Sequence, residues 1–193
     1  MQLVLTDEIF MKNKRVLIIK GSARKEGYTN RLCDRVQELL SDNQIVVFDT
    51  FDEKFLPCNG CNYCEKNGRC VHRDLDVFFE QFENADLIIF ASPVYNGTFS
   101  APLKGLIDRF QTYYTRFYAS GKVQPIKKRR RAIFIAAAGR DGKKSFDFMK
   151  WQLSCAFSIL NVEFIHSVLC PFTDTEPRYD EALEELKRSF TYE

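Results

Sequence analysis

The sequence predicts an α/β fold in which helices cover both faces of a parallel sheet. Short apolar runs alternate with longer amphipathic runs along most of the 193-residue chain. The short runs are almost continuously apolar, as strands are when helices cover them on both sides. The alternation and the continuous apolar runs together favour strand–helix–strand units over an antiparallel sheet or a helical bundle.

The first part of the chain begins this alternation. The run RVLIIKGS at 15–22 predicts a buried strand that ends in Gly-Ser, and QIVVFDT at 44–50 predicts the next strand. Residues 29–40 between them predict a helix, with Thr29 and Asn30 as candidate caps. The apolar side chains of this helix recur at helical spacing: Leu32, Cys33, Val36, Leu39 and Leu40.

The middle of the chain repeats the pattern after a cysteine-rich loop at 57–71. Residues 74–85 predict a short helix, ADLIIFASPVY at 85–95 predicts a third buried strand, and 101–118 predict a longer helix. The apolar face of the short helix is expected to carry Val77, Phe78 and Phe82. The longer helix has an apolar stripe made of Leu103, Leu106, Ile107, Phe110, Tyr113 and Tyr114.

The last part of the chain completes the sheet. RAIFIAAAG at 131–139 and VEFIHSVLC at 162–170 predict strands, and 145–161 and 180–190 predict helices. Five strands in this pattern predict a flavodoxin-like three-layer sandwich, with a five-stranded parallel sheet in the order 2-1-3-4-5. Residues 1–12 precede the first strand and are expected to form an extra edge strand or an arm onto a partner subunit.

The bulk composition bounds the domain count and the class of partner. Because 45% of the 193 residues are hydrophobic, residues 1–193 are expected to form a single domain with a full core. The formal net charge of +2 gives no reason to expect a nucleic-acid partner. We interpret the dense basic run KKRRR at 127–131 as a solvated loop that leads into a strand; the alternative is a grip on a cofactor phosphate.

The sequence gives no sign of a membrane partner or an export signal. No run reaches the roughly 18 apolar residues that a membrane span needs. The first residues also lack a basic, apolar and small-residue leader, so we expect a cytoplasmic protein. In that compartment clustered cysteines indicate a metal or redox site rather than disulfides, and the odd total of seven cysteines agrees with this.

Three loops follow strand ends, where ligands bind in this fold. GSARKEGYTN at 21–30 combines a tight-turn glycine with several donors before a helix, so it can cradle an anion, although an ordinary capped loop explains it too. SPVYNGT at 92–98 either offers an aromatic face and backbone donors to a flat conjugated ligand or simply connects a strand to a helix. AAAGRDGKK at 136–144 has small residues that allow a close approach to the backbone.

Two of these loops carry a resemblance to a known family. The motifs G-S-A-R-x-x-G-x-T-N and S-P-V-Y-N-G-x-x-S-A-x-L-K-x-x-I-D-R resemble those of the NADPH-dependent FMN reductase family, and the likeness extends over residues 14–170. Between the two motifs, C-N-G-C-x-x-C-x5-C resembles the iron–sulfur flavoprotein branch of that family. The resemblance implies FMN as cofactor, NADPH or NADH as electron donor, and assembly as a homodimer or homotetramer.

The resemblance also implies roles for individual residues. The FMN phosphate would be held by Ser22, Arg24, Thr29 and Asn30. The isoalloxazine ring would be wrapped by Pro93, Val94, Tyr95, Asn96 and Gly97, with Ala138 and Gly139 at a third flavin loop. We assign no catalytic acid or base, because the flavin carries the chemistry. Lys104, Asp108 and Arg109 match the family's helix after the second loop, and we interpret them as helix packing and an exposed ion pair.

Four of the seven cysteines lie close together: Cys58, Cys61, Cys64 and Cys70. Their spacing differs from the paired C-x2-C sets of structural zinc and from the C-x2-C-x2-C-x3-C-P run of ferredoxins. Disulfides between residues three apart would be strained. Gly60 and Gly68 give the loop the freedom to wrap a 4Fe–4S cluster, which we favour; a cluster-free redox or structural loop and a zinc site remain open.

The expected function is that of an FMN-dependent oxidoreductase. Electrons would pass from NAD(P)H through FMN, and through the cluster if it is present, to a second flavin, a quinone or another small acceptor. The alternative is a non-enzymatic electron carrier between protein partners, which would not turn over a pyridine nucleotide. A third hypothesis is a cysteine-loop binding module without flavin.

Overall fold

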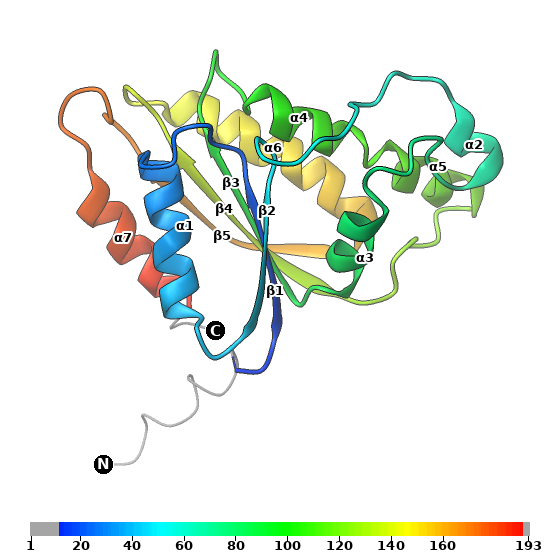
Figure 1. Ribbon diagram of the computed structural model, residues 1–193, viewed down its shortest axis with the longest axis horizontal. Coiled ribbons are helices and arrows are strands. Elements are labelled where there is room, and N and C mark those ends of the chain that lie inside the picture. Colours follow the sequence, from blue (N-terminus) through cyan, green and yellow to red (C-terminus); the bar gives the residue numbers. More distant parts are fainter. Residues whose placement is uncertain (1–11, 191–193) are drawn as a thin grey trace.

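A five-stranded parallel sheet forms the centre of the molecule. The computed structural model describes residues 12–190, and the predicted arm at 1–12 lies outside them except for Lys12. The strands run in the order β2-β1-β3-β4-β5, which confirms the predicted fold (Figure 1). Their bounds are β1 (Arg15–Lys20), β2 (Gln44–Asp49), β3 (Leu87–Pro93), β4 (Arg130–Ala137) and β5 (Val162–Cys170).

Helices form a layer on each side of the sheet. They are α1 (Tyr28–Leu39), α2 (Tyr63–Asn67), α3 (Asp76–Asn84), α4 (Ala101–Asp108), α5 (Gln111–Ala119), α6 (Lys143–Leu160) and α7 (Tyr179–Arg188). Helices α1 and α7 pack on one face, and α3, α4 and α6 pack on the other (Figure 1). Helix α2 lies beyond the sheet, against α5.

Side chains of the inner strands alternate between two apolar cores. In β1, Val16 and Ile18 point toward α1 and α7, whereas Leu17 and Ile19 point toward the opposite helical layer. This period of two is the geometry of a strand that is covered on both faces. The second core is rich in rings, and Phe82 and Phe110 lie 4.9 Å apart between their centroids. In the inner strands the continuous apolar runs therefore reflect burial on both faces, whereas Val46 and Val47 of the edge strand β2 are 37% and 41% exposed.

The predicted helix at 101–118 was wrong in one respect, because the structure divides it into α4 and α5. At the break, the amides of Arg109 and Phe110 donate to the carbonyls of Leu106 and Ile107, three residues back. Such bonds tighten the last turn of a helix and let the chain change direction. Lys104 and Asp108 form the expected exposed ion pair, at 2.6 Å, whereas the Arg109 side chain is only 1% exposed.

Two other expectations about side chains are corrected by the structure. Val77 lies outside the apolar face of α3 and is 69% exposed, whereas Phe78 and Phe82 are buried and Phe79 packs against the core. The basic run at 127–131 is not uniformly solvated, since Arg130 is 1% exposed and donates to the Phe82 and Leu160 carbonyls. Burial lowers the pKa of Arg130 to about 10, so it stays charged at neutral pH.

Among the described residues, no helix has the length and apolar character required to cross a membrane.

Asp86 joins three segments at the amino-terminal edge of the sheet. Its Oδ2 accepts a hydrogen bond from the Arg15 amide at 2.8 Å, and its Oδ1 lies 2.7 Å from Lys128 Nζ. Burial by itself would raise the pKa of Asp86, but the bonds from Arg15 and Lys128 bring that pKa below its ordinary value. A lowered pKa stabilises the fold above the ordinary carboxyl pKa of about 3.9, and this stabilisation is lost as the pH falls.

We therefore expect Asp86→Asn to lower the free energy of unfolding by about 1 kcal/mol at pH 7, after allowance for solvent exposure, and by less at pH 3. Urea unfolding at pH 7 and at pH 3 measures the free energy of unfolding of the variant and of the parent protein. Asp147→Asn, in the exposed pair with Lys143, is the control and should change little. An equal loss at both pH values for Asp86→Asn would contradict the electrostatic account.

Candidate functional site

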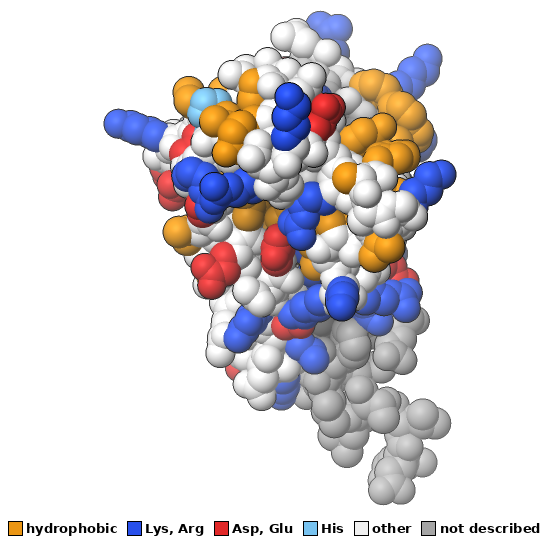
Figure 2. All heavy atoms as spheres, turned by 90° about the vertical axis from the view of Figure 1, so that its right-hand side faces the viewer, with side chains coloured by type: hydrophobic (Ala, Val, Ile, Leu, Met, Phe, Trp, Pro, Cys, Tyr) orange, Lys and Arg blue, Asp and Glu red, His pale blue; other side chains and the backbone are white. Residues whose placement is uncertain are grey.

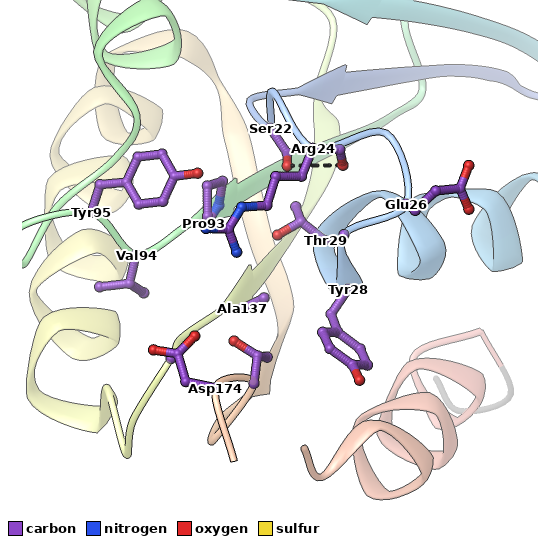
Figure 3. A pocket seen from close by; sticks show the side chains of 13 residues that line it. Ser22, Arg24, Glu26, Tyr28, Thr29, Pro93, Val94, Tyr95, Ala137 and Asp174 are labelled. Carbon is purple, nitrogen blue, oxygen red and sulfur yellow. Dashed lines mark hydrogen bonds between the residues drawn. The ribbon is translucent and has the colours of Figure 1, made fainter. Parts of the chain in front are cut away.

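A pocket of about 470 Å³ opens at the carboxyl edge of the sheet. Its walls come from four segments that follow β1, β3, β4 and β5, and Figure 3 shows their side chains converging on one space. Seven of the residues proposed from the sequence lie in the wall: Ser22, Arg24, Thr29, Pro93, Val94, Tyr95 and Gly139. The pocket therefore brings together all three loops that the strand ends indicated.

The loop after β1 forms the polar side of the pocket. Ser22 and Thr29 are buried, while Arg24 is exposed and extends its guanidinium into the space (Figure 3). Asn30 is buried behind the wall, and its side-chain Nδ2 donates to the Arg24 carbonyl at 3.0 Å. Gly27 precedes α1, and no side chain caps this end of the helix. The N–H groups of the first turn therefore keep no partner within the helix, and Gly27, Tyr28 and Thr29 line the pocket. This arrangement suits an anion.

Close packing explains the glycine that follows β1. A Cβ at Gly21 would lie 2.8 Å from Leu103 Cδ2 and 3.0 Å from the Ala91 carbonyl oxygen. The Gly21 amide also donates to that carbonyl at 2.8 Å. Gly21 is thus fixed by lack of space rather than by an unusual backbone angle, and it holds the anion loop close to β3.

The loop after β3 forms the aromatic side. Ser92 is fully buried, and its Oγ accepts from the Ser100 amide at 3.2 Å, which ties the two ends of the loop together. Val94 donates its amide to Ala137 at 2.8 Å. Asn96 and Gly97 both have positive φ, of 48° and 83°, and form the tip of a tight turn rather than the pocket wall. Their proposed contact with a flavin ring stays a prediction.

Tyr95 and Tyr28 stand on opposite sides of the pocket (Figure 3). Tyr95 is 39% exposed at the start of the turn. Tyr28 belongs to the first turn of α1 and lies 5.8 Å from the ring of Tyr179, with the Arg31 guanidinium over both rings. These contacts give the pocket two aromatic walls, of which the one at Tyr28 is supported by neighbouring side chains.

The pocket has a further wall that the sequence analysis missed. Thr173 and Asp174 follow β5 and line the space, together with Glu26, Gly27, Tyr28 and Ala137. The available signal was the polar run after the fifth strand, which ends at the same edge of the sheet as the others. Ala138, by contrast, is buried behind the wall, where its amide donates to the Cys170 carbonyl at 2.9 Å.

The four clustered cysteines occupy a separate segment beyond β2. All four thiols are free, and all four line one small cavity of about 30 Å³, next to Arg109. The segment contains the short helix α2, which the sequence analysis did not predict. Gly60 and Gly68 have φ of 69° and 65°, and a side chain would meet open space at both, so glycine serves the backbone angle there.

Figure 2 looks onto this end of the molecule and shows hydrophobic side chains gathered in patches between Lys and Arg side chains. Within residues 12–190, no group of three or more His, Cys, Asp or Glu side chains is close enough to hold a metal ion. The four thiols thus share a cavity without converging on one point.

Two of the three scattered cysteines, Cys33 and Cys170, are buried, unlike the clustered set. Burial raises the pKa of the Cys33 thiol to about 12 and that of Cys170 to about 11, so both remain protonated at neutral pH. Protonated, buried thiols are weak nucleophiles and weak metal ligands. Redox or metal chemistry is therefore not expected of Cys33 or Cys170, whereas the clustered thiols are exposed or half-buried.

Gly139 offers a test of the pocket wall. A Cβ there would collide with the carboxylate of Asp174, but this side chain is exposed and can move aside, so Gly139→Ala should displace Asp174 and lower the free energy of unfolding by only about 0.5 kcal/mol. Chemical denaturation measures the loss. The double variant Gly139→Ala/Asp174→Ala removes the obstacle and should recover most of it. A loss of about 2 kcal/mol or more in the single variant would show that Asp174 cannot move aside.

Comparison with known proteins agrees with this geometry. A family model described as NADPH-dependent FMN reductase matches residues 14–153. An iron–sulfur flavoprotein of Methanocaldococcus jannaschii is 36% identical over 112 residues, which are 56% of this chain and 58% of that protein. Other relatives with the same description match at 34% identity. The chain spans about half the length of the curated relatives it matches.

Solved structures share the fold at low sequence identity. An NAD(P)H:quinone oxidoreductase from Methanothermobacter marburgensis superposes with a TM-score of 0.71 at 17% identity, covering 93% of this chain and 95% of the other. An FMN-dependent NADH-azoreductase from Bacillus anthracis, in complex with FMN, gives 0.67 at 18% identity, covering 91% and 95%. With a family model that spans most of the sheet and both loop motifs, the chain belongs to the NADPH-dependent FMN reductase family.

Proposed function

We propose that this protein binds FMN in the pocket at the carboxyl edge of the sheet and passes electrons from NADPH or NADH to a small acceptor. The observation that carries the proposal is the pocket itself. It combines an anion-binding loop at the start of α1 with an aromatic loop after β3, in a chain of the FMN reductase family. The acceptor would be a second flavin, a quinone or another small molecule.

The loop after β1 would hold the phosphate of FMN. Ser22, Thr29 and the first amides of α1 supply neutral donors, and Arg24 supplies the positive charge. Asn30 would act indirectly, because its amide holds the Arg24 carbonyl and so fixes the loop. Glu26 belongs to the same loop as Arg24, whereas Asp174 brings negative charge to the wall after β5. A phosphate would be repelled there, so the charge pattern favours one orientation of the cofactor.

The remaining walls would hold the ring. Pro93, Val94 and Tyr95 offer an apolar and aromatic surface, and Gly139 allows close approach on the other side. Bound FMN supplies the redox chemistry, by accepting hydride from the nicotinamide and releasing electrons to the acceptor. The side chains of the pocket would bind and orient the flavin and shield it from water, and none of them is needed as an acid or a base. A pyridine nucleotide would approach over the exposed Tyr95 side of the pocket.

We further propose that Cys58, Cys61, Cys64 and Cys70 hold a 4Fe–4S cluster. Four free thiols around one cavity are the donor set that such clusters use. Arg109 Nε is buried without a partner in the described structure and belongs to a side chain in the same cavity wall, which suits sulfur acceptors. Binding requires the thiols to converge further, which rotation of the partly exposed side chains allows. The relatives described as iron–sulfur flavoproteins favour this site over zinc.

The cytoplasmic location and a homodimer or homotetramer stay predictions of the sequence. A non-enzymatic electron carrier is the alternative function, because the same cofactors would serve it. It differs in one measurable property, since it would not be reduced by NADPH or NADH.

The phosphate loop is tested by Arg24→Ala. Loss of one charge-assisted hydrogen bond should weaken FMN binding about tenfold to a hundredfold, measured by quenching of flavin fluorescence on titration of apoprotein. Arg35→Ala is a matched control, because Arg35 pairs with Glu38 on α1 and does not line the pocket. Equal affinity of the Arg24 variant and the control would place the phosphate elsewhere.

The cofactor content and the reaction are tested on protein purified without oxygen. We expect flavin absorption bands with a broad shoulder near roughly 400 nm, and about four irons and four sulfides per chain. Rapid mixing with NADPH should then bleach the flavin. Flavin without iron would support the reductase proposal and contradict the cluster proposal. Reduction by dithionite but not by NADPH or NADH would favour the carrier, and protein that stays colourless with added FMN would contradict the flavin site.

A further inference from the structure

A buried arginine joins the two ends of the cysteine segment. Arg109 stands at the break between α4 and α5 and is 1% exposed. Its Nη1 donates to the Leu56 carbonyl at 2.6 Å, and its Nη2 donates to the His72 carbonyl at 3.0 Å. Leu56 lies two residues before the first clustered cysteine, and His72 lies two residues after the last. One guanidinium thus spans both ends of the loop.

Asp74 completes this connection. Its Oδ1 accepts from Arg109 Nη2 at 2.8 Å, and its Oδ2 accepts from the Leu56 amide at 2.8 Å. The carboxylate therefore bridges the same two ends that the arginine bridges. Although burial by itself would raise the pKa of Asp74, the bonds from Arg109 and Leu56 lower it, so the ionised form persists at neutral pH.

The base of the loop also rests on α4. A Cβ at Gly105 would lie 3.3 Å from Pro57 Cβ, so the chain just before Cys58 runs close to the helix. Arg109 itself belongs to the wall of the cavity that the four cysteines line. The same side chain therefore contacts the loop ends and borders the proposed cofactor site.

We propose that Arg109 is a positioning residue that closes the cysteine segment and holds its four thiols around one cavity, with Asp74 as its partner. The inference rests on the proposed cluster site for its function, but the closure itself is a property of the protein without metal. A planar guanidinium with several fixed donors can bridge three acceptors, whereas a lysine ammonium cannot match that geometry. Closure in advance reduces the ordering that cofactor binding would otherwise require.

The variants Arg109→Lys, Arg109→Met and Asp74→Asn test this proposal. Lys104→Met is the matched control, because Lys104 lies on α4 and pairs with Asp108 at the surface. The first measurement is amide hydrogen exchange of the full-length protein that carries FMN but no metal. Peptides that cover Leu56 and α2 should exchange about tenfold faster or more in the three variants, while the control should match the parent protein.

The second measurement is retention of iron after reconstitution with iron and sulfide, under challenge with a chelator. We expect retention to weaken about tenfold to a hundredfold in the three variants, as loss of a supporting residue does in other metal sites. FMN content, measured on the same samples, should stay unchanged, because Arg109 does not line the flavin pocket. If Arg109→Met fails to fold, Arg109→Lys and the partly exposed Asp74→Asn decide the question.

The outcomes separate the two proposals. If the parent protein binds no iron, the cluster proposal fails, and the closure is judged on hydrogen exchange alone. If the parent protein binds iron and the variants keep both its exchange rates and its iron, Arg109 does not position the loop. Faster exchange with loss of iron, at constant FMN, supports the inference.

Discussion

The parallel sheet, buried on both faces, is the constraint on which the other features depend. Parallel strands place all their carboxyl ends at one edge of the sheet. In the order β2-β1-β3-β4-β5, the chain adds β2 on one side of β1 and β3 on the other side, so the strand order switches between β1 and β3. At this switch the loops after the two strands diverge to opposite faces and leave a space between them. The pocket wall includes Ser22 after β1 and Val94 after β3, so its position follows from topology before any side chain is considered.

Two kinds of constraint shape the loops around that pocket. Close packing fixes Gly21, where an added Cβ would meet Leu103 and the Ala91 carbonyl oxygen. Hydrogen bonds from buried polar side chains fix the backbone elsewhere, as the Asn30 amide does with the Arg24 carbonyl. The proposed phosphate and ring contacts therefore lie on loops that are already held in place, which is how a protein orients a cofactor at low entropic cost.

The cysteine segment is attached to this framework by different means. It contributes little to the apolar core, because its four cysteines are exposed or half-buried. Its attachment comes from polar contacts at its base, where Arg109 and Asp74 join the residues that flank it. A segment held at its ends and open between them can adapt to a bound group without disturbing the sheet. The flavin pocket and the cysteine cavity have no lining residue in common.

The sequence by itself determined the strand order, the strand-end loops and the family, because continuous apolar runs and two spaced motifs are local patterns. It could not determine which residues after β5 join the pocket, since Thr173 and Asp174 reach it only through the packing of the sheet. The sequence interpretation also limited Arg109 to helix packing or an exposed ion pair, because helical periodicity does not reveal a break after Asp108 or a partner 35 residues away at Asp74. Contacts distant in sequence depend on the folded chain, and only the tertiary structure decided them.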